Sequence, residues 1–338
     1  MGMDPEASKS AARACKSVDE AVEWILDGQS ANLAHSFEEV VESPPVIATV
    51  EDIEKENDEP ITTVTVLTYN VWFEDIALKE RMTEICRLID SKKPDFVALQ
   101  EVTPEIAYFL RSDPRLKTYC WSNPPPGAPY FTMLLSKRKG GFQRLAFPGS
   151  QQGRDLLCAE GNMGFGQKIS VATSHLESAL PPYHGPAMND QARRDQMKMA
   201  SELMTQTNKD RNIIFMGDMN WDDKGKEGPA LAAIGEGWGD AWLTLKPAKD
   251  LGCTYNGKLN PMLLNYLQKR LDRIFFKLKD FAPSHIEMLG QSPIPGVTYE
   301  KQTKKGPKTL PVVASDHFGL YCEFQSCAAG GWAGRRLG

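Results

Sequence analysis

Apolar residues are spaced in three different ways along the chain, and each spacing predicts a different structure. Residues 1–28 show helical spacing over two short stretches, and Gly28 stands where the second helix would end. Residues 29–60 have little periodic apolar content and contain the breaks SPP and NDEP, which predicts a flexible acidic linker. From residue 61, β-branched apolar runs alternate with amphipathic stretches, which is typical of an α/β domain.

Most of the strands predicted in this domain end, or begin, beside polar residues. Strands are predicted at 61–71, 96–102, 168–174, 212–217, 271–277 and 318–324, and helices at 78–89 and 187–207. Long loops are predicted at 121–130 and 292–310, and a disordered tail at 326–338. Because α/β proteins bind ligands beyond the ends of their strands, we expect one site formed by the polar strand ends.

Composition is that of an ordinary globular protein, with 338 residues, 41% hydrophobic and 25% charged. No apolar run approaches 18 residues and the first residues lack a secretory pattern, so neither a membrane span nor a secretory signal is expected. The seven cysteines are an odd number and include no C-x-x-C pair. This favours reduced thiols in the cytosol or nucleus over a disulfide framework or a zinc site.

The net charge of −5 conceals an asymmetry between the two parts of the chain. Residues 1–60 contain 15 acidic and 4 basic side chains, whereas the remainder contains 29 acidic and 35 basic. A mildly basic domain suits a phosphate-rich substrate, although a solvated surface with no preferred partner explains the charge equally well.

Each polar strand end is ambiguous when taken alone. Asn70 fits an ordinary turn, and Glu101 after a buried run fits either a salt bridge or a metal ligand. His175 more often signals a satisfied hydrogen bond than catalysis, and Gly, Asp and Asn around Asp218 also favour a simple turn. Together they form an ordered series along one domain, which is far more specific than any member.

That series is Asn, Q-E, S-H-L, G-D-x-N and S-D-H, and it resembles the endonuclease/exonuclease/phosphatase superfamily, with its deoxyribonuclease I-like fold. The resemblance covers residues 61–325. It implies a four-layer α/β sandwich of two packed mixed sheets flanked by helices, forming one phosphodiesterase catalytic domain.

Longer strings narrow the resemblance. LTYNVWFED, TSHLES, NIIFMGDMN, KRLDRIFFK and SDHFGLYCEF are similar to the 5′-tyrosyl-DNA phosphodiesterase family (tyrosyl-DNA phosphodiesterase 2). The resemblance implies a nuclear DNA-repair enzyme, also present in the cytoplasm. Its substrate would be DNA with a topoisomerase II peptide on a single-stranded or frayed 5′ end, which it would release to leave a 5′-phosphate. A monomer that does not bind membranes is expected.

The same resemblance implies a metal site. Glu101 would be the direct ligand of Mg2+, with Asn70 and Asp316 beside it, and Mn2+ is an expected substitute. A hard cation with oxygen ligands is in keeping with this set.

The resemblance also implies the catalytic roles. Asp218 would orient or deprotonate the attacking water, and Asn220 would hold it. His175 and His317 would donate hydrogen bonds to the non-bridging oxygens, with Asp272 orienting His317.

Five residues are expected to contact the substrate, namely Ser178, Tyr130, Tyr255, Arg193 and Arg194. The chain departs from animal relatives at Asp222, where they have an arginine near the phenol. A carboxylate cannot make the same cation–π contact, so Arg193 and Arg194 are the expected replacements. Tyr255 stands where relatives commonly have tryptophan, and stacking on a base or sugar is retained.

Four lysines, Lys301, Lys304, Lys305 and Lys308, cluster in the segment expected to be a loop. Contact with DNA phosphates and simple solvation of a loop are both consistent with this cluster.

Residues 1–28 resemble the later two helices of a ubiquitin-associated domain, with MGM in place of its Met-Gly-Phe loop. This implies a partial, weakly ordered module and ubiquitin as a partner, whereas a helical appendage without that role is the alternative.

Two further functions remain open from sequence. One is another Mg2+-dependent phosphodiesterase of the superfamily, such as an abasic endonuclease, a deadenylase or a phosphoinositide phosphatase. The other is a ubiquitin-binding adaptor with an inactive phosphodiesterase fold. The presence of every expected catalytic side chain argues against the adaptor.

Overall fold

A computed structural model of the chain describes residues 61–138, 140–162, 168–178, 189–208, 212–224 and 228–327. The expected helical segment 1–28, the linker 29–60 and the tail from 328 onward lie outside these residues. Residues 61–125 and those from 130 onward form one compact unit, which contains all the elements discussed below.

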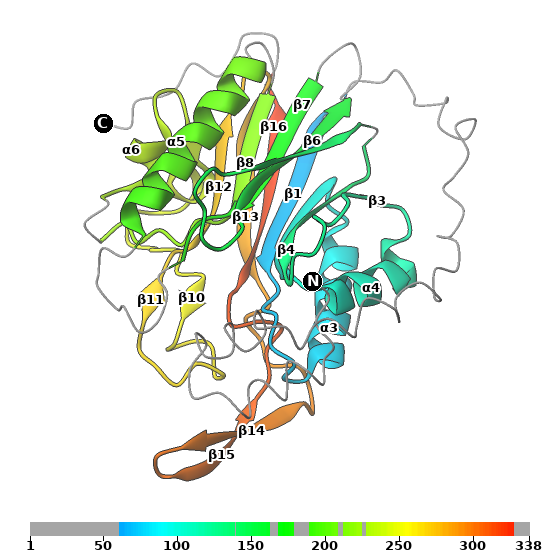
Figure 1. Ribbon diagram of the computed structural model, residues 1–338, viewed down its shortest axis with the longest axis vertical. Helices are drawn as coiled ribbons and strands as arrows, with labels where there is room; N and C mark the ends of the chain where they lie inside the picture. The colour runs from blue at the N-terminus through cyan, green and yellow to red at the C-terminus, as the bar shows by residue number, and fades with distance from the viewer. Residues whose placement is uncertain are drawn as a thin grey trace. The chain divides into compact units, whose positions relative to one another are not determined.

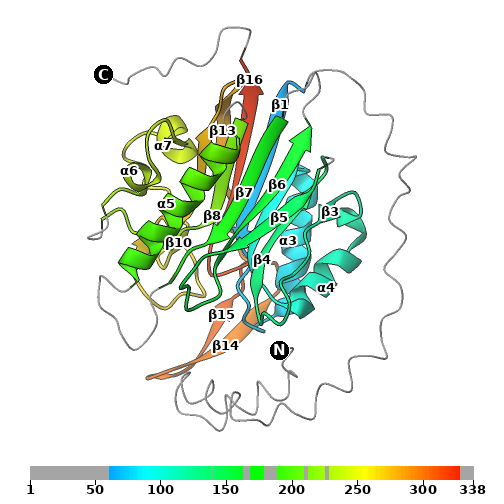
Figure 2. The same ribbon diagram turned by 45° about the horizontal axis from the view of Figure 1, so that its top comes forward.

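Two six-stranded sheets form the centre of this unit (Figures 1 and 2). The first has the order β13 (Phe281–Leu289), β16 (Gly319–Ser326), β1 (Thr63–Asn70), β2 (Phe96–Val102), β4 (Phe131–Ser136) and β3 (Cys120–Trp121). The second has the order β5 (Phe142–Ala146), β6 (Asp155–Asn162), β7 (Lys168–His175), β8 (Asn212–Asp218), β12 (Asp272–Lys277) and β9 (Gly239–Asp240). Both sheets are mixed. In the first, β1 pairs parallel to β2 and antiparallel to β16, and in the second, β8 pairs parallel to β7 and antiparallel to β12.

The core lies between the facing surfaces of the two sheets. Val66 and Phe96 of the first sheet and Val171, Ile214 and Ile274 of the second belong to one buried apolar cluster. The near-continuous apolar runs that predicted these strands are explained by this arrangement, because helices cover the outer surfaces.

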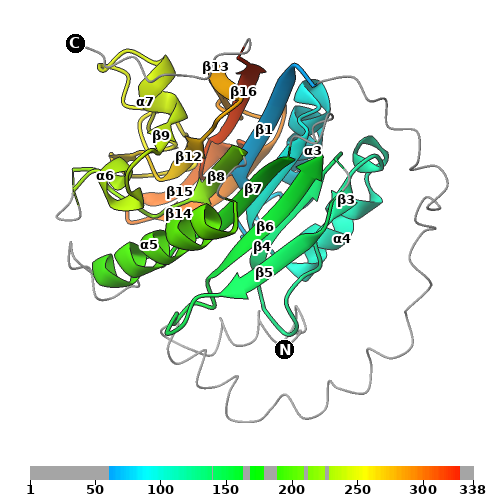
Figure 3. The same ribbon diagram turned by 90° about the horizontal axis from the view of Figure 1, so that it is seen from above.

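Helices lie outside both sheets (Figure 3). On the first sheet these are α3 (Leu78–Lys92) and α4 (Pro104–Ser112), and on the second α5 (Asp190–Thr207) and α6 (Ala230–Ile234). A short 3-10 helix, η3 (Pro114–Leu116), follows α4, and α7 (Ala241–Leu245) packs near β12 and β13. The four-layer deoxyribonuclease I-like sandwich expected from sequence is therefore confirmed. Among the described residues, no helix has the length and apolar character needed to span a membrane.

Local sequence explains where α3 forms and stops. Met82, Ile85, Cys86 and Ile89 recur at helical spacing and are fully buried. Lys93 ends the helix in the left-handed conformation, and Pro94 follows it. The predicted helix 78–89 is thus confirmed and extends by one further turn.

One predicted loop is wrong. Within 292–310 the chain forms a hairpin of β14 (Thr298–Thr303) and β15 (Gly306–Pro311), paired antiparallel. Its lysines and prolines hid the strand signal, because Tyr299 and the buried Leu310 are its only large apolar side chains. A second short hairpin joins β10 (Tyr255–Asn256) to β11 (Gln268–Lys269), and β16 runs to Ser326, one residue into the predicted tail.

Candidate active site

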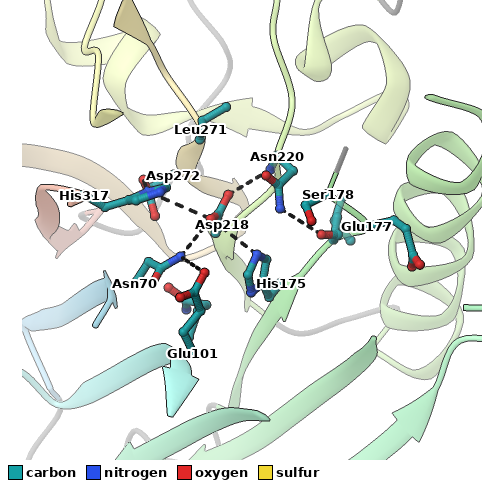
Figure 4. A network of polar contacts seen from close by, with 12 residues as sticks. Asn70, Glu101, His175, Glu177, Ser178, Asp218, Asn220, Leu271, Asp272 and His317 are labelled. Carbon is teal, nitrogen blue, oxygen red and sulfur yellow. Dashed lines mark hydrogen bonds and ion pairs between the residues drawn. The ribbon is translucent and has the colours of Figure 1, made fainter. Parts of the chain in front are cut away.

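Polar side chains from the ends of both sheets meet at one edge of the sandwich (Figure 4). At its centre is Asn70, the last residue of β1, which is fully buried. Its Nδ2 donates to Oε1 of Glu101 at 3.0 Å and to Oδ2 of Asp218 at 3.0 Å. Because Glu101 belongs to the first sheet and Asp218 to the second, this amide joins the two halves of the site.

Strand register aligns three of the predicted catalytic residues. Asp218, at the end of β8, lies opposite His175 on β7 and opposite Asp272 on β12. Nε2 of His175 lies 3.5 Å from Oδ2 of Asp218, and both side chains are buried. The register between strands therefore places His175, Asp218 and Asp272 side by side in one row, although they are far apart in sequence.

His317 completes the row from the first sheet. Its Nδ1 lies 2.8 Å from Oδ2 of Asp272, and its ring packs edge-on against Tyr255 with centroids 5.3 Å apart. Ser315 fixes this segment by donating from Oγ to the carbonyl oxygen of Asn70 at 2.7 Å. The predicted pairing of Asp272 with His317 is thus present as a direct contact.

Electrostatics differ sharply between the two histidines. Burial, reinforced by the nearby Arg154 guanidinium, lowers the pKa of His175 to about 3, so this ring is neutral. Burial opposes charge on His317 as well, but Asp272, Asp316 and Asp218 raise its pKa well above 6.5. A neutral and a cationic imidazole therefore flank the same carboxylate.

Asp218 itself is ionised despite complete burial. Burial favours its neutral form, but His175 and His317 and hydrogen bonds from Asn220 and Asn70 hold its pKa below 3.8. The backbone N–H of Asn220 donates to Oδ1 of Asp218 at 2.9 Å, and the side-chain Nδ2 of Asn220 donates to the Leu176 carbonyl at 3.0 Å. Asn220 has a left-handed backbone with φ 48°, which asparagine tolerates better than most residues.

Glu101 reaches the site through an irregularity in β2. The pairing of β2 with β4 shifts between Leu99 and Val102, and Glu101 has a φ of 60°. Gln100 instead turns inward and donates from Nε2 to Oγ1 of Thr173 in the second sheet at 3.1 Å. Adjacent residues of the Q-E pair thus serve different purposes, one linking the sheets and the other facing the site.

Glu101 and Asp316 form a half-buried acidic pair. Burial and the charge of Asp316 raise the pKa of Glu101 to about 7, and burial also raises the pKa of Asp316. In the part of the chain that the structure describes, neither carboxylate has a salt bridge. Two carboxylates without a salt bridge, beside the Asn70 amide, make an oxygen-rich set that fits a divalent cation.

A second possible ligand set consists of Asp218, Asp272 and His317, which offer one atom each within 4.8 Å of one another. Here the Asp272–His317 contact already uses Nδ1 of the ring. Because Mg2+ prefers oxygen ligands, Glu101 and Asp316 suit it better.

The expected substrate contacts have mixed outcomes. Ser178 lies beside the row, with its Oγ donating to Oε1 of Gln152 at 3.1 Å, and Tyr130 and Tyr255 are half-buried near the site. Arg194 is partly exposed on α5. Arg193, by contrast, is buried and donates to the Glu177 carbonyl at 2.9 Å and to Asp190 at 2.6 Å. A substrate-binding role for Arg193 does not fit this position, because its guanidinium secures α5 against the end of β7.

Sequence reasoning missed Arg154. It is buried, its Nη2 donates to Oε1 of Gln152 at 2.8 Å, and its guanidinium lies 5.4 Å from the Tyr130 ring centroid. Its loop is secured by the buried Glu177, which accepts from the Gln151 and Gln152 amides at 2.9 and 3.0 Å. Among the described residues Arg154 has no carboxylate partner, and a cation this close to His175 suits an anionic substrate. No local sequence pattern indicates its role, because Arg154 precedes β6, a strand that was not among those predicted from sequence.

Asp222 forms a salt bridge where relatives were expected to have an arginine. Its Oδ2 lies 3.7 Å from Nζ of Lys269, which is paired with Tyr255 across the β10–β11 hairpin. A cation therefore stands beside this position after all, supplied by a residue distant in sequence.

Comparisons with known proteins agree with this geometry. The Endonuclease/Exonuclease/phosphatase family model matches residues 67–317. Tyrosyl-DNA phosphodiesterase 2 of Rattus norvegicus is 27% identical over 273 residues, which cover 78% of this chain and 67% of that protein. The crystal structure of D. rerio tyrosyl-DNA phosphodiesterase 2 with a single-strand DNA product is 26% identical, with a TM-score of 0.61, covering 78% of this chain and 99% of that one. A truncated Caenorhabditis elegans structure of the same name, 20% identical over 78% of this chain and 97% of that one, shares the fold with a TM-score of 0.64.

Proposed function

Because the chain belongs to the endonuclease/exonuclease/phosphatase family, we propose that it is a DNA-repair phosphodiesterase. It hydrolyses the 5′-phosphotyrosyl bond between topoisomerase II and DNA and leaves a 5′-phosphate. The similarity to tyrosyl-DNA phosphodiesterase 2 proteins, one solved with single-strand DNA product, supports this choice within the family.

One observation carries the proposal. The Asn70 amide holds Glu101 and Asp218 together across the two sheets, and two imidazoles flank Asp218. This combines a cation site, an ionised base and hydrogen-bond donors within one buried group, as phosphodiester hydrolysis requires.

A divalent cation, proposed as Mg2+ with Mn2+ as a substitute, would be held by Glu101, Asn70 and Asp316. When bound, it supplies Lewis-acid stabilisation of charge on a phosphate oxygen. Its positive charge would also relieve the repulsion between Glu101 and Asp316.

The protein side chains divide the remaining work. Asp218, ionised and buried, orients the attacking water and takes its proton, with Asn220 positioned beside it. His175 and His317 donate hydrogen bonds to the non-bridging oxygens, and Asp272 holds the His317 ring in place. The leaving phenol has a pKa of about 10, so it departs with less protonation than an alkoxide needs.

Location and partners follow from this activity as proposals. A topoisomerase–DNA linkage implies that the protein acts in the nucleus as a monomer on single-stranded or frayed 5′ ends. Ubiquitin is proposed to bind residues 1–28, and titration of the 338-residue chain into labelled ubiquitin should shift ubiquitin resonances. Unchanged spectra at high protein concentration would remove this partner.

Hydrolysis of a 5′-phosphotyrosyl oligonucleotide, with and without Mg2+, tests the activity directly. We expect a 5′-phosphate product only with metal, no cleavage of the 3′-phosphotyrosyl isomer, and loss of activity in Glu101→Gln. Abasic DNA, polyadenylated RNA and phosphoinositides serve as competing substrates. Faster turnover of any of these would reassign the protein within the family, and no metal-dependent hydrolysis at all would favour the adaptor.

A further inference from the structure

The β14–β15 hairpin, here called the lysine hairpin, carries four lysines and one acidic residue, Glu300. Lys301 is in β14, Lys304 and Lys305 form the turn, and Lys308 is in β15. In the described part of the chain, none of them takes part in a salt bridge. The last three are exposed. With four lysines and Glu300 as its one acidic side chain, the hairpin has a concentrated net positive charge.

This charge is costly and is not needed to form the hairpin. Lys301 and Lys308 are directly opposite in the register, and like charges at such a position are destabilising. Gly306 provides the positive φ of 106° at the turn, so Lys304 and Lys305 are not required by backbone conformation. An anionic ligand would offset the repulsion between Lys301 and Lys308.

The lysines have a defined direction. Side chains on a hairpin alternate between faces, so Tyr299, Lys301, Lys308 and Leu310 share one face. On that face, the Tyr299 hydroxyl donates to the Met262 carbonyl at 3.2 Å, and Nζ of Lys301 donates to the same oxygen at 3.3 Å. The lysine-bearing face is thus turned toward the segment that joins β10 to β11.

That segment leads directly to the active site. Tyr255, where it begins, packs on His317, and Nδ2 of Asn260 donates to the carbonyls of Ser315 and Asp316 at 2.9 and 3.2 Å. The hairpin itself ends at Pro311, five residues before Asp316. Figure 1 shows both hairpins at the end of the sandwich from which β16 begins. The lysine face therefore continues the surface of the catalytic edge.

We propose that the lysine hairpin binds the phosphate backbone of the DNA strand whose 5′ end occupies the active site. This inference rests on the proposed function. Six strand residues at roughly 3.4 Å each give the hairpin a length of about 20 Å, enough to follow several phosphates. Tyr266, 87% exposed in the adjacent segment, adds an aromatic ring on which a base can stack. Backbone cations combined with stacking rings are typical of single-strand recognition.

A matched pair of variants tests the proposal. In the first, Lys301, Lys304, Lys305 and Lys308 are all changed to Gln. In the control, four exposed lysines elsewhere, Lys117, Lys168, Lys249 and Lys279, receive the same change. Binding of a 5′-phosphorylated single-stranded oligonucleotide is measured by fluorescence anisotropy over a range of salt concentrations, and thermal melting verifies that both variants fold.

The hairpin variant should reduce the slope of log K against log salt by about 2 to 3, since each phosphate contact contributes about 0.7. The control should reduce it by less than about 1. Turnover of thymidine 5′-monophosphate p-nitrophenyl ester, which extends little beyond the reacting phosphate, should be equal in all three proteins.

Equal slopes in the two variants would overturn the proposal. Tighter DNA binding by the hairpin variant would also overturn it. A slope difference in a protein that does not cleave phosphotyrosyl ends would retain the hairpin and reject the proposed function. Cleavage of phosphotyrosyl ends together with equal salt slopes in the two variants would retain the proposed function and reject the role of the hairpin.

Discussion

Nδ1 of His317 lies 2.8 Å from Oδ2 of Asp272, and both side chains are buried. The two residues approach from different sheets, since Asp272 begins β12 and His317 lies two residues before β16. The backbone amide of Asp272 donates to Oγ1 of the buried Thr254 at 3.1 Å, which fixes the start of β12. The carboxylate is therefore held in place and sets the orientation of the ring.

Asp272→Asn should lower kcat on a 5′-phosphotyrosyl oligonucleotide by about 10- to 100-fold, because the ring loses its charged partner. KM should change little, since Asp272 acts through His317 and does not reach the substrate. Asp280→Asn, at the other end of β12 where Asp280 accepts from Asn212, is the control and should retain full activity. A wild-type kcat in Asp272→Asn would refute this role.

Addition of Mg2+ should raise the melting temperature of the wild-type protein and leave that of Glu101→Gln unchanged. Without metal, Glu101→Gln should melt above the wild type, because the repulsion between Glu101 and Asp316 is removed. Calorimetric melting with and without EDTA measures both effects. Glu105→Gln, on exposed α4 surface, should respond to Mg2+ as the wild type does. A metal response retained by Glu101→Gln would place the cation elsewhere.

Acid should destabilise the protein through His175. Its pKa is lowered to about 3 in the folded state, so the unfolded chain binds the proton first as pH falls below 6.5. The stability contributed by the neutral ring is complete above 6.5 and is lost progressively toward pH 3. Urea unfolding at pH 7 and pH 5 should show that the wild type loses about 2 kcal/mol more than His175→Gln. Parallel losses in the two proteins would contradict the neutral, buried ring.

Arg81→Lys should destabilise the protein by at least about 3 kcal/mol. The buried guanidinium donates to five carbonyls, those of Val71, Trp72, Glu74, Ile76 and Ala314. An ammonium group has three donors and cannot satisfy them all. Because these carbonyls flank Asn70 and Ser315, the affinity for Mg2+ should fall as well. Arg87→Lys, exposed on the same helix, is the control and should stay within about 0.5 kcal/mol of wild type. Equal losses of stability in the two variants would contradict this role of the Arg81 hydrogen bonds.

The site residues themselves could be predicted because each follows a local rule. Asn70, Glu101, His175 and Asp218 stand at the ends of apolar runs, and such runs are strands whose ends lie at the edge of a sheet. The helix α3 was likewise visible in its apolar spacing. Local spacing fails for the lysine hairpin, because Tyr299 and Leu310 are its only large apolar side chains and do not form a periodic pattern.

Sequence alone determined which donors and carboxylates the protein has, in which order, and on which kind of element. Only the tertiary structure decided their partners. It turned Arg193 into the protein, brought Arg154 toward His175 and set Lys269 beside Asp222. The reason is physical: strand register and sheet packing join residues far apart in the chain, and burial and pKa depend on those neighbours rather than on adjacent residues.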